Sequence, residues 1–262
     1  MTPPPVIGLL SDFGTRDWYV AAMRGVILSH CPTAQLIDIT HEIPPQDVVA
    51  GALVLSGALP WLPRGAVVVA LVDPGVGSRR VLLAAQVDGR YLVGPDNGLL
   101  ALSLQQATRT QTVRLTRSRY WLPAVSRTFH GRDILAPVAA HLASGVALSR
   151  LGVRVRRVAP LELPSVRRRG QQYHGEVVHI DGFGNLVTNL PGSLLARGRA
   201  LVHYRNQPVR AVGTYAEARV GELIALVGSV GLIELALRNH SAAQRVAALR
   251  GERIVLQVQK RR

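Results

Sequence analysis

Short apolar runs alternate with longer stretches of helical pattern through the first half of this chain, and this alternation limits the folds open to it. Three runs have the length and composition of buried strands, namely Val6–Leu10, Gln35–Ile39 and Ala66–Val72. Three stretches have the spacing of helices, namely Asp17–Ser29, Asp47–Ala58 and Asp133–Ala143. Strands that alternate with helices are typical of a mostly parallel sheet with helices on both faces. We therefore expect an α/β domain over residues 1–160.

Two local signals add detail to this domain. Asp47 stands directly before its apolar stretch, where a carboxylate accepts backbone N–H groups of a first helical turn. Val81–Val87 and Tyr91–Gly94 flank Asp88-Gly89, a dipeptide that favours the tight turn of a β-hairpin. The sequence therefore predicts a helix capped by Asp47 and a hairpin that turns at residues 88 and 89.

The pattern changes near Ala159. Pro160, Pro164 and the run Arg167–Gly170 indicate a polar linker over residues 161–170. Short strand-like segments separated by Gly and Asn turns follow, namely Gly175–Asp181, Ala200–Tyr204, Gln207–Ala211, Leu223–Val227, Leu232–Ala236 and Arg253–Val258. Short strands at close spacing are typical of a small all-β barrel or sandwich. We expect such a second domain over residues 171–262.

Composition limits the class of protein. The chain has 262 residues, of which 48% are hydrophobic, which is enough for one large core or two smaller ones. A single cysteine, Cys31, excludes an internal disulfide framework and a cysteine-based zinc site. We find neither a signal peptide pattern nor an apolar stretch of membrane-spanning length. We therefore expect a cytoplasmic globular enzyme or binding protein without a membrane partner.

The net charge of +15 raises the question of nucleic-acid binding. Lys260 is the only lysine, so almost all of the basic residues are arginine, a skew that indicates genomic base composition. The arginines are scattered, apart from clusters at Arg154–Arg157, Arg167–Arg169 and the tail Lys260–Arg262. Solvated surface charge explains this pattern better than a phosphate-binding face, so nucleic acid is not an expected partner.

Polar side chains stand where the predicted parallel strands end, which is where open α/β sheets bind ligands. The first strand delivers Ser11 and Asp12, the second Asp38 and Thr40, and the third Asp73. For Asp38 we favour a structural role as the cap of the next helix. Asp12 and Asp73 are followed within two residues by glycines, which let the backbone approach a ligand, so we favour functional roles for both.

Several chemistries lack their sequence support. Gly75-Val76-Gly77 lacks the third glycine of a dinucleotide motif, and no phosphate-binding loop or serine-nucleophile elbow is present. A polar cluster, Thr128–Asp133, stands at a predicted helix start, where Asp133 would cap the helix. His130 there could converge with Asp73 and Arg80 on one water, or hold a metal with Asp73. Because an arginine would repel a cation, we expect neither a metal nor another cofactor.

Seven motifs in order now support a resemblance. They are Ser11–Gly14, Asp38–His41, Val72–Arg80, Pro95–Gly98, Phe129–Asp133, Asp181–Asn185 and Thr188-Asn189. The set resembles the S-adenosylmethionine (SAM) hydroxide adenosyltransferase family, the adenosine-forming SAM hydrolases, which are related to the fluorinases and chlorinases. The resemblance implies an N-terminal α/β domain, a C-terminal β-barrel, and a homotrimer with its sites between subunits. It also implies hydrolysis of SAM to adenosine and methionine by in-line attack of water on the ribose C5′.

The resemblance further implies a role for each matching residue. Asp12 would bind the ribose diol. Asn185 would bind the adenine edge, with Phe183 and Tyr215 packed on the ring, and the methionine part would be held by Asp17, Asp181 and Ser229. Asp73, Arg80 and His130 would activate the water, with His130 as the proton acceptor.

Departures from the related halogenases favour hydrolysis. Those enzymes carry an aromatic residue in place of Asp73 and a small hydroxylated residue in place of Val76, and Asp73 would repel a halide. Gln46 departs from the family itself, which usually has an aromatic residue near the ribose. Arg79 is adjacent to Arg80 and competes with it for membership of the triad. The alternatives are a halide-dependent SAM transferase, a non-catalytic SAM-binding module and a basic RNA-binding protein.

Overall fold

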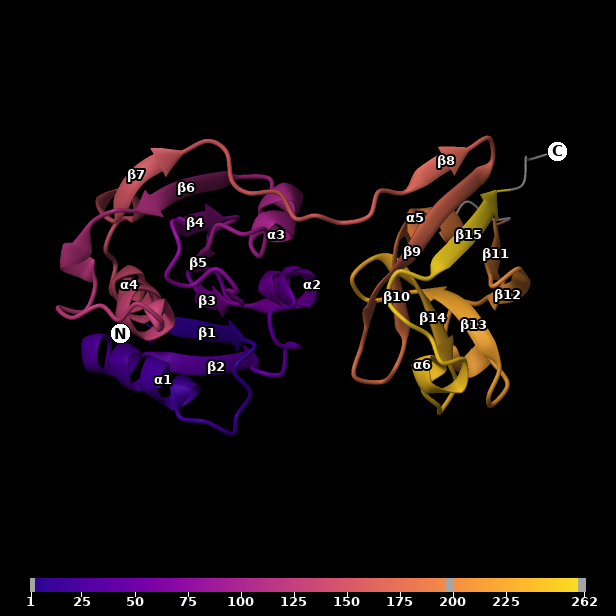
Figure 1. Ribbon diagram of the computed structural model, residues 1–262, viewed down its shortest axis with the longest axis horizontal. Helices are drawn as coiled ribbons and strands as arrows, with labels where there is room; N and C mark the ends of the chain where they lie inside the picture. Colours follow the sequence, from indigo (N-terminus) through magenta and orange to yellow (C-terminus); the bar gives the residue numbers. More distant parts are fainter. Residues whose placement is uncertain (1–2, 197–199, 259–262) are drawn as a thin grey trace. The chain divides into compact units, whose positions relative to one another are not determined.

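The computed structural model describes residues 3–196 and 200–258, and the chain divides into two compact units (Figure 1). Unit 1 extends to Glu162, and unit 2 begins at Leu163. The basic tail Lys260–Arg262 lies outside the described residues. Across the described ranges, no helix is both long and apolar enough to cross a membrane.

Unit 1 contains a seven-stranded sheet. Its strands are β1 (Val6–Ser11), β2 (Gln35–Thr40), β3 (Val67–Leu71), β4 (Leu82–Val87), β5 (Arg90–Pro95), β6 (Thr110–Leu115) and β7 (Gly152–Val155). They lie in the order β2-β1-β3-β5-β4-β6-β7. The pairs from β2 to β5 are parallel, and the pairs from β5 to β7 are antiparallel. The predicted α/β domain is confirmed, with a sheet of mixed direction.

The change of direction occurs at the predicted hairpin. β4 and β5 pair antiparallel across the turn at Asp88 and Gly89, which have φ of 46° and 85°. Both values lie in the left-handed region, which asparagine, aspartate and glycine adopt most readily. The hairpin prediction is therefore confirmed, and it places an antiparallel half beside the parallel one.

Helices cover both faces of this sheet. One face packs against α1 (Tyr19–His30) and α4 (Ala136–Ala143), and the other against α2 (Val48–Ala58) and α3 (Ala101–Gln106). This follows from strand alternation, since Ile7 and Leu9 face α1 and α4 while Leu10 faces α2. The side chain of Asp47 accepts the Ala50 N–H at 2.9 Å, which confirms the predicted cap of α2.

The last helix of unit 1 begins differently from the prediction. A π-helical turn, Gly131–Leu135, leads directly into α4. Asp133 lies inside this turn, fully buried, and does not cap the helix. Its carboxylate accepts the Ser126 N–H at 2.8 Å and pairs with Arg132. Asp133 therefore fixes the segment that precedes His130.

Unit 2 is a closed barrel. Its strands are β8 (Arg167–Arg169), β9 (Gln172–Ile180), β10 (Leu186–Pro191), β11 (Ala200–Tyr204), β12 (Gln207–Ala211), β13 (Leu223–Val227), β14 (Leu232–Leu237) and β15 (Arg253–Val258), with two short helices, α5 (Ser193–Ala196) and α6 (Ala242–Arg245). Their order is β10-β14-β13-β12-β11-β15-β9-β8, and β10 also pairs with β9. This pairing closes seven strands and leaves β8 outside the ring. The predicted barrel is confirmed, and part of the segment expected as a linker forms β8.

Candidate functional site

Asp12 and Asp73 line one cavity of unit 1. Asp12 follows β1 and Asp73 lies two residues beyond β3, and these neighbouring strands are parallel, so their carboxyl ends meet at the same edge of the sheet. The cavity has a volume of about 290 Å³. It is lined by Asp12, Phe13, Pro45, Gln46, Leu71, Asp73, Pro74, Val76, Thr128, Phe129, His130 and Gly131. The structure thus brings together three side chains that the sequence predicted for one site.

Asp12 is held by the backbone of a neighbouring loop. Its Oδ2 accepts the Gln46 N–H at 2.8 Å, and Gln46 has a φ of 65°, which is unusual for a residue with a side chain. Among the described residues no donor reaches Oδ1 of Asp12. One carboxylate oxygen is therefore anchored and the other is free for a ligand.

Asp73, Arg80 and His130 form a continuous polar group. Arg80 Nε donates to both carboxylate oxygens of Asp73, at 2.8 and 2.6 Å, and Arg80 Nη2 lies 3.0 Å from His130 Nδ1. The side chains of Arg80 and Asp73 are only 8% and 4% exposed, so solvent screens this pair weakly. Arg79 is exposed, and Arg80 is the arginine that makes these contacts.

His130 is kept neutral by its surroundings. Burial and the charge of Arg80 lower the pKa of His130, and together they outweigh the carboxylates of Asp73 and Asp133. Because the guanidinium can only donate, Nδ1 is the acceptor and the proton of the neutral ring lies on Nε2. The other ring nitrogen interacts with the backbone of Ser126, and the role of His130 as proton acceptor stays a prediction.

The loop that joins Asp73 to Arg80 needs a glycine at one position. Gly77 has a φ of 79°, and a Cβ there would lie 2.8 Å from the carbonyl oxygen of Arg127. A side chain would therefore be strained and would push the loop away from the segment that leads to His130. The positive φ and the close approach of Arg127 therefore explain why a glycine occupies position 77.

Two aromatic rings that line the cavity, Phe13 and Phe129, belong to a larger aromatic cluster. Phe129 packs against Phe13, Trp18 and Tyr19, with ring centroids 5.4 to 5.8 Å apart. Trp18 is 58% exposed although it belongs to this cluster. Asp17, predicted to contact methionine, is exposed and is not among the residues that line the cavity. Sequence reasoning missed this aromatic cluster. The available signal was that Phe13, Trp18 and Tyr19 lie close together in the sequence.

Unit 2 carries a separate cavity of about 550 Å³. It is lined by Phe183, Asn185, Tyr215, Leu237, Arg238, Asn239, His240 and Ser241. Phe183, Asn185 and Tyr215 are the three residues predicted to contact adenine, and the structure places them together. Phe183 is 84% exposed, an unusual state for a large aromatic ring outside a binding surface.

Asp181 stabilises the turn that carries Phe183 and Asn185. It accepts the N–H groups of Phe183 and Asn185, at 2.9 and 2.8 Å, and the side-chain amide of Asn185 at 2.9 Å. The bond to Asn185 orients that amide and leaves its oxygen as a free acceptor. Ser229 is exposed on the turn between β13 and β14. Neither Asp181 nor Ser229 lines the cavity.

Sequence reasoning also missed Glu234, which supports Tyr215. The phenol of Tyr215 donates a short hydrogen bond to Glu234, and Glu234 is 6% exposed. Burial raises the pKa of Glu234, although the bond from Tyr215 acts in the opposite direction. A single acid inside the apolar strand β14 was the available signal.

No metal cluster accompanies these groups. Within residues 3–196 and 200–258, no three His, Cys, Asp or Glu side chains are grouped so that they could hold a metal ion. The side chains that the structure does bring together are a carboxylate, a guanidinium and an imidazole. Such a group can orient a water and stabilise charge on it.

Both halves of the chain match known domains. Residues 7–152 match the SAM hydroxide adenosyltransferase N-terminal domain, and residues 175–255 match the C-terminal domain of the same family. A crystal structure of an uncharacterized conserved protein from Thermotoga maritima is similar, with a TM-score of 0.88 and 31% identity, covering 96% of this chain and 100% of that one.

Similarity extends to curated proteins over nearly the whole chain. An (R)-S-adenosyl-L-methionine hydrolase from Salinispora tropica is 40% identical over 97% of this chain and 98% of its own length. Another from Thermus thermophilus is 40% identical over 92% of this chain and 95% of its own. A fluorinase from an Actinoplanes species is more distant, at 27% identity over 88% of this chain and 90% of its own.

Proposed function

The chain belongs to the SAM hydroxide adenosyltransferase family, and on this premise we propose how it acts: it hydrolyses S-adenosyl-L-methionine to adenosine and L-methionine. The observation that carries the mechanism is the contact of Arg80 with both Asp73 and His130, beside a cavity that Asp12 also lines. Ribose recognition by Asp12 and water activation by the triad would then occur in one place.

The chemistry requires an activated water. The sulfonium makes methionine a neutral leaving group, so sulfur needs no general acid. Water attacks the ribose C5′ opposite sulfur, the new C–O bond forms as the C–S bond breaks, and the electron pair stays on sulfur. One water proton passes to a carboxylate oxygen of Asp73 and then to solvent, while His130 orients Arg80 through its Nδ1. Arg80 keeps Asp73 in place and stabilises charge on the attacking oxygen.

Substrate recognition divides between the two cavities. In unit 1 the free oxygen of Asp12 meets the ribose diol, and in unit 2 the oxygen of Asn185 accepts a hydrogen bond from the adenine amino group. Phe183 and Tyr215 supply faces for the ring. Asp17, Asp181 and Ser229 are proposed for the methionine part on the resemblance alone, since each lies outside the cavities.

We also propose a homotrimer whose sites lie at subunit interfaces. Each cavity by itself offers only part of the contacts that SAM requires, and the exposed rings of Trp18 and Phe183 would be covered on assembly. Burial would exclude bulk water from a site that must select one water.

Two other functions are less well supported. In a halide-dependent transferase the negative charge of the Asp73 carboxylate would repel the incoming halide, which disfavours halide binding. A non-catalytic SAM-binding module would have no use for the triad contacts of Arg80.

Incubation with SAM in heavy-oxygen water, followed by mass analysis, tests the proposal. Adenosine and methionine should appear, with the heavy oxygen on the 5′-hydroxyl of adenosine. Adding fluoride or chloride should give no halogenated nucleoside. Label found only in methionine, adenine released as free base, or a halogenated product would each contradict the proposed reaction, and SAM binding without turnover would leave only the binding module.

A further inference from the structure

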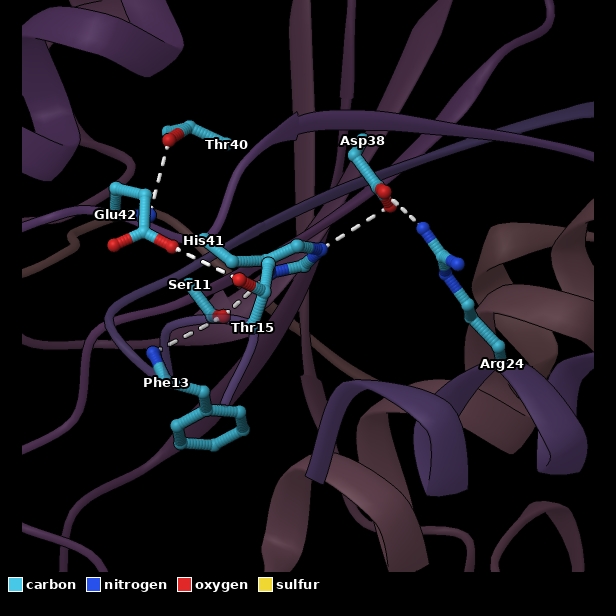
Figure 2. Close-up of polar contacts among 8 residues, drawn as sticks. All are labelled: Ser11, Phe13, Thr15, Arg24, Asp38, Thr40, His41 and Glu42. Carbon is cyan, nitrogen blue, oxygen red and sulfur yellow. Dashed lines mark hydrogen bonds and ion pairs between the residues drawn. The ribbon is translucent and has the colours of Figure 1, made fainter. Parts of the chain in front are cut away.

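A chain of four polar side chains lies beside the turn that carries Asp12, and the proposed mechanism does not use it (Figure 2). Ser11 Oγ lies 2.7 Å from His41 Nδ1, and His41 Nε2 lies 3.1 Å from Asp38 Oδ1. Arg24, on α1, forms an ion pair with Asp38. Ser11 and His41 are 1% and 4% exposed, whereas the Asp38 and Arg24 side chains are 37% and 41% exposed.

The order serine, histidine, aspartate resembles the arrangement that activates a serine nucleophile. Here the hydroxyl has no open approach, because Ser11 is buried and is not among the residues that line the cavity beside Asp12. Ser11 Oγ also accepts a hydrogen bond of 3.4 Å from the backbone N–H of Phe13. These contacts give Ser11 a structural use and exclude an attacking one.

The geometry arises from an irregularity between β1 and β2. The register runs Leu9 to Asp38 and then Leu10 to Thr40, so one extra residue enters β2. In a regular strand, side chains three residues apart point to opposite faces, and residues 38 and 41 could not meet. The extra residue turns the strand end, so His41 reaches Asp38 and Ser11 together. Asp38 is therefore a partner of His41 and not the cap of α2.

The segment that follows β2 contacts the Asp12 turn at several points, one of them an exposed hydrogen bond of 3.5 Å from the Thr15 hydroxyl to Glu42. His41 contacts Ser11 through its ring, and its carbonyl oxygen accepts the Gly14 N–H at 2.7 Å. Further along, the Gln46 N–H is bonded to Asp12 itself. The ring of His41 is the buried side-chain contact among these, and it can be removed without altering the backbone.

We propose that His41 is a positioning residue for nucleoside recognition: by holding Ser11, it sets the direction in which Asp12 presents its free oxygen. This inference rests on the proposed function, because it assigns Asp12 to the ribose. The proton order follows from the donors. Phe13 N–H donates to Ser11 Oγ, and because a carboxylate can only accept, His41 Nε2–H donates to Asp38.

The far end of the chain is fixed by charge. Burial raises the pKa of Asp38, but hydrogen bonds and attraction from Arg24 and His41 outweigh it, so the pKa of Asp38 is lowered. The carboxylate therefore remains an acceptor for His41, and Arg24 ties it to α1. A rigid helix thus supports the turn through three side chains.

Adenosine binding measures this role without the chemical step. We expect His41→Ala to weaken adenosine binding about tenfold and to raise the KM for SAM by a similar factor. In an Asp12→Ala background, adding His41→Ala should weaken adenosine binding little further, because the effect passes through Asp12. Two substitutions separate the ring nitrogens. His41→Asn places an amide near Nδ1 and should retain more affinity than His41→Gln, whose amide lies near Nε2.

His141→Ala is the matched control, since this half-buried histidine of α4 contacts His30 and Tyr120, and its variant should bind adenosine normally. If His41→Ala does not fold, the Asn and Gln variants carry the comparison. The inference is overturned if the folded His41 variants bind adenosine as the wild type does, or if their loss is unchanged in the Asp12→Ala background. A wild type that neither binds adenosine nor turns over SAM would instead refute the proposed function.

Discussion

Arg80 is the residue on which the others of the proposed triad depend. It donates to both oxygens of Asp73 and to the ring of His130, so neither partner has its present environment without it. Groups arranged around one shared donor act as a unit, and the losses from removing them do not add.

We expect Asp73→Ala, Arg80→Ala and His130→Ala each to lower kcat about a hundredfold or more. The double change Asp73→Ala with His130→Ala should be little worse than the poorer single variant, while SAM affinity changes far less than kcat. Steady-state kinetics and calorimetry measure both quantities. Arg79→Ala, which removes an exposed neighbour, is the control and should remain near wild type. Full turnover in all three single variants would place water activation elsewhere.

The pH dependence follows from His130. Its pKa lies below the ordinary 6.5, and Nδ1 can accept from Arg80 only while the ring is neutral. We expect kcat/KM to stay constant as the pH falls through 6.5 and to decline only below it. The unfolded chain protonates first, so stability from this group is complete above pH 6.5 and decreases between 6.5 and the lowered pKa. In His130→Gln, residual turnover should lack this decline. A midpoint above 6.5 in the wild type would contradict the neutral ring.

At the scale of elements, the π-helical turn before α4 places His130. A Cβ on Gly131 would lie 2.3 Å from Leu71 Cδ2 and 3.4 Å from the Phe129 ring, so this turn packs against the end of β3 without room for a side chain. π-Helical turns interrupt regular helices at functional sites more often than elsewhere.

Gly131→Ala should therefore reduce both stability and turnover. We expect about 1–3 kcal/mol of destabilisation, from overpacking, in chemical denaturation. The rate should fall because His130 is adjacent to the displaced backbone. Gly25→Ala is the comparison, since a Cβ there meets no atom within 4 Å on exposed α1 and should be neutral or slightly stabilising. Wild-type kinetics in Gly131→Ala would show that the turn does not set the position of His130.

Elements differ in how far the sequence predicts them. β1 and β3 are apolar because helices cover both faces of the sheet at these strands. An apolar run of this kind identifies a strand from the sequence alone. β6 and β10 were not predicted from the sequence, because polar residues interrupt the apolar pattern of these strands. Hydrogen bonding to neighbouring strands defines both of them.

The residues of the candidate site also differ in how far the sequence predicts them. Asp12 and Asp73 were predictable as neighbours, because strand ends of a parallel sheet converge. For Arg80 and His130, fifty residues apart, the residues alone left a water-activating group and a metal site as alternatives, and the family resemblance favoured the first. The contact of His41 with Ser11 depends on one extra residue in β2, for which no sequence rule exists.

At the scale of the whole molecule, the proposed function assigns the ribose to a cavity of unit 1 and the adenine to a cavity of unit 2. The proposed homotrimer makes this arrangement testable. If each site combines unit 1 of one subunit with unit 2 of another, a hybrid oligomer can contain one site in which neither unit carries a substitution.

Inactive variants should therefore complement each other. We expect co-refolding of Asp12→Ala with Asn185→Ala to restore a fraction of wild-type turnover, because one substitution is in unit 1 and the other in unit 2. Co-refolding Asp12→Ala with Asp73→Ala should restore none, since both substitutions damage the same unit. Equal lack of recovery in the two mixtures, with hybrids demonstrated by mass, would place each complete site within one subunit.

The closure of the barrel has a consequence for how the molecule behaves in concentrated solution. Ring closure removes strand edges, and in the described part of unit 2 the unpaired edge is β8, only three residues long and all arginine. Open edges recruit other chains, and short, cationic ones resist this. Replacing Arg167, Arg168 and Arg169 with threonine should increase light scattering during refolding, whereas the same exchange at Arg119, Arg150 and Arg245, which removes equal charge from residues outside β8, should not. The arginine run of β8 would then act against fibril-like self-association.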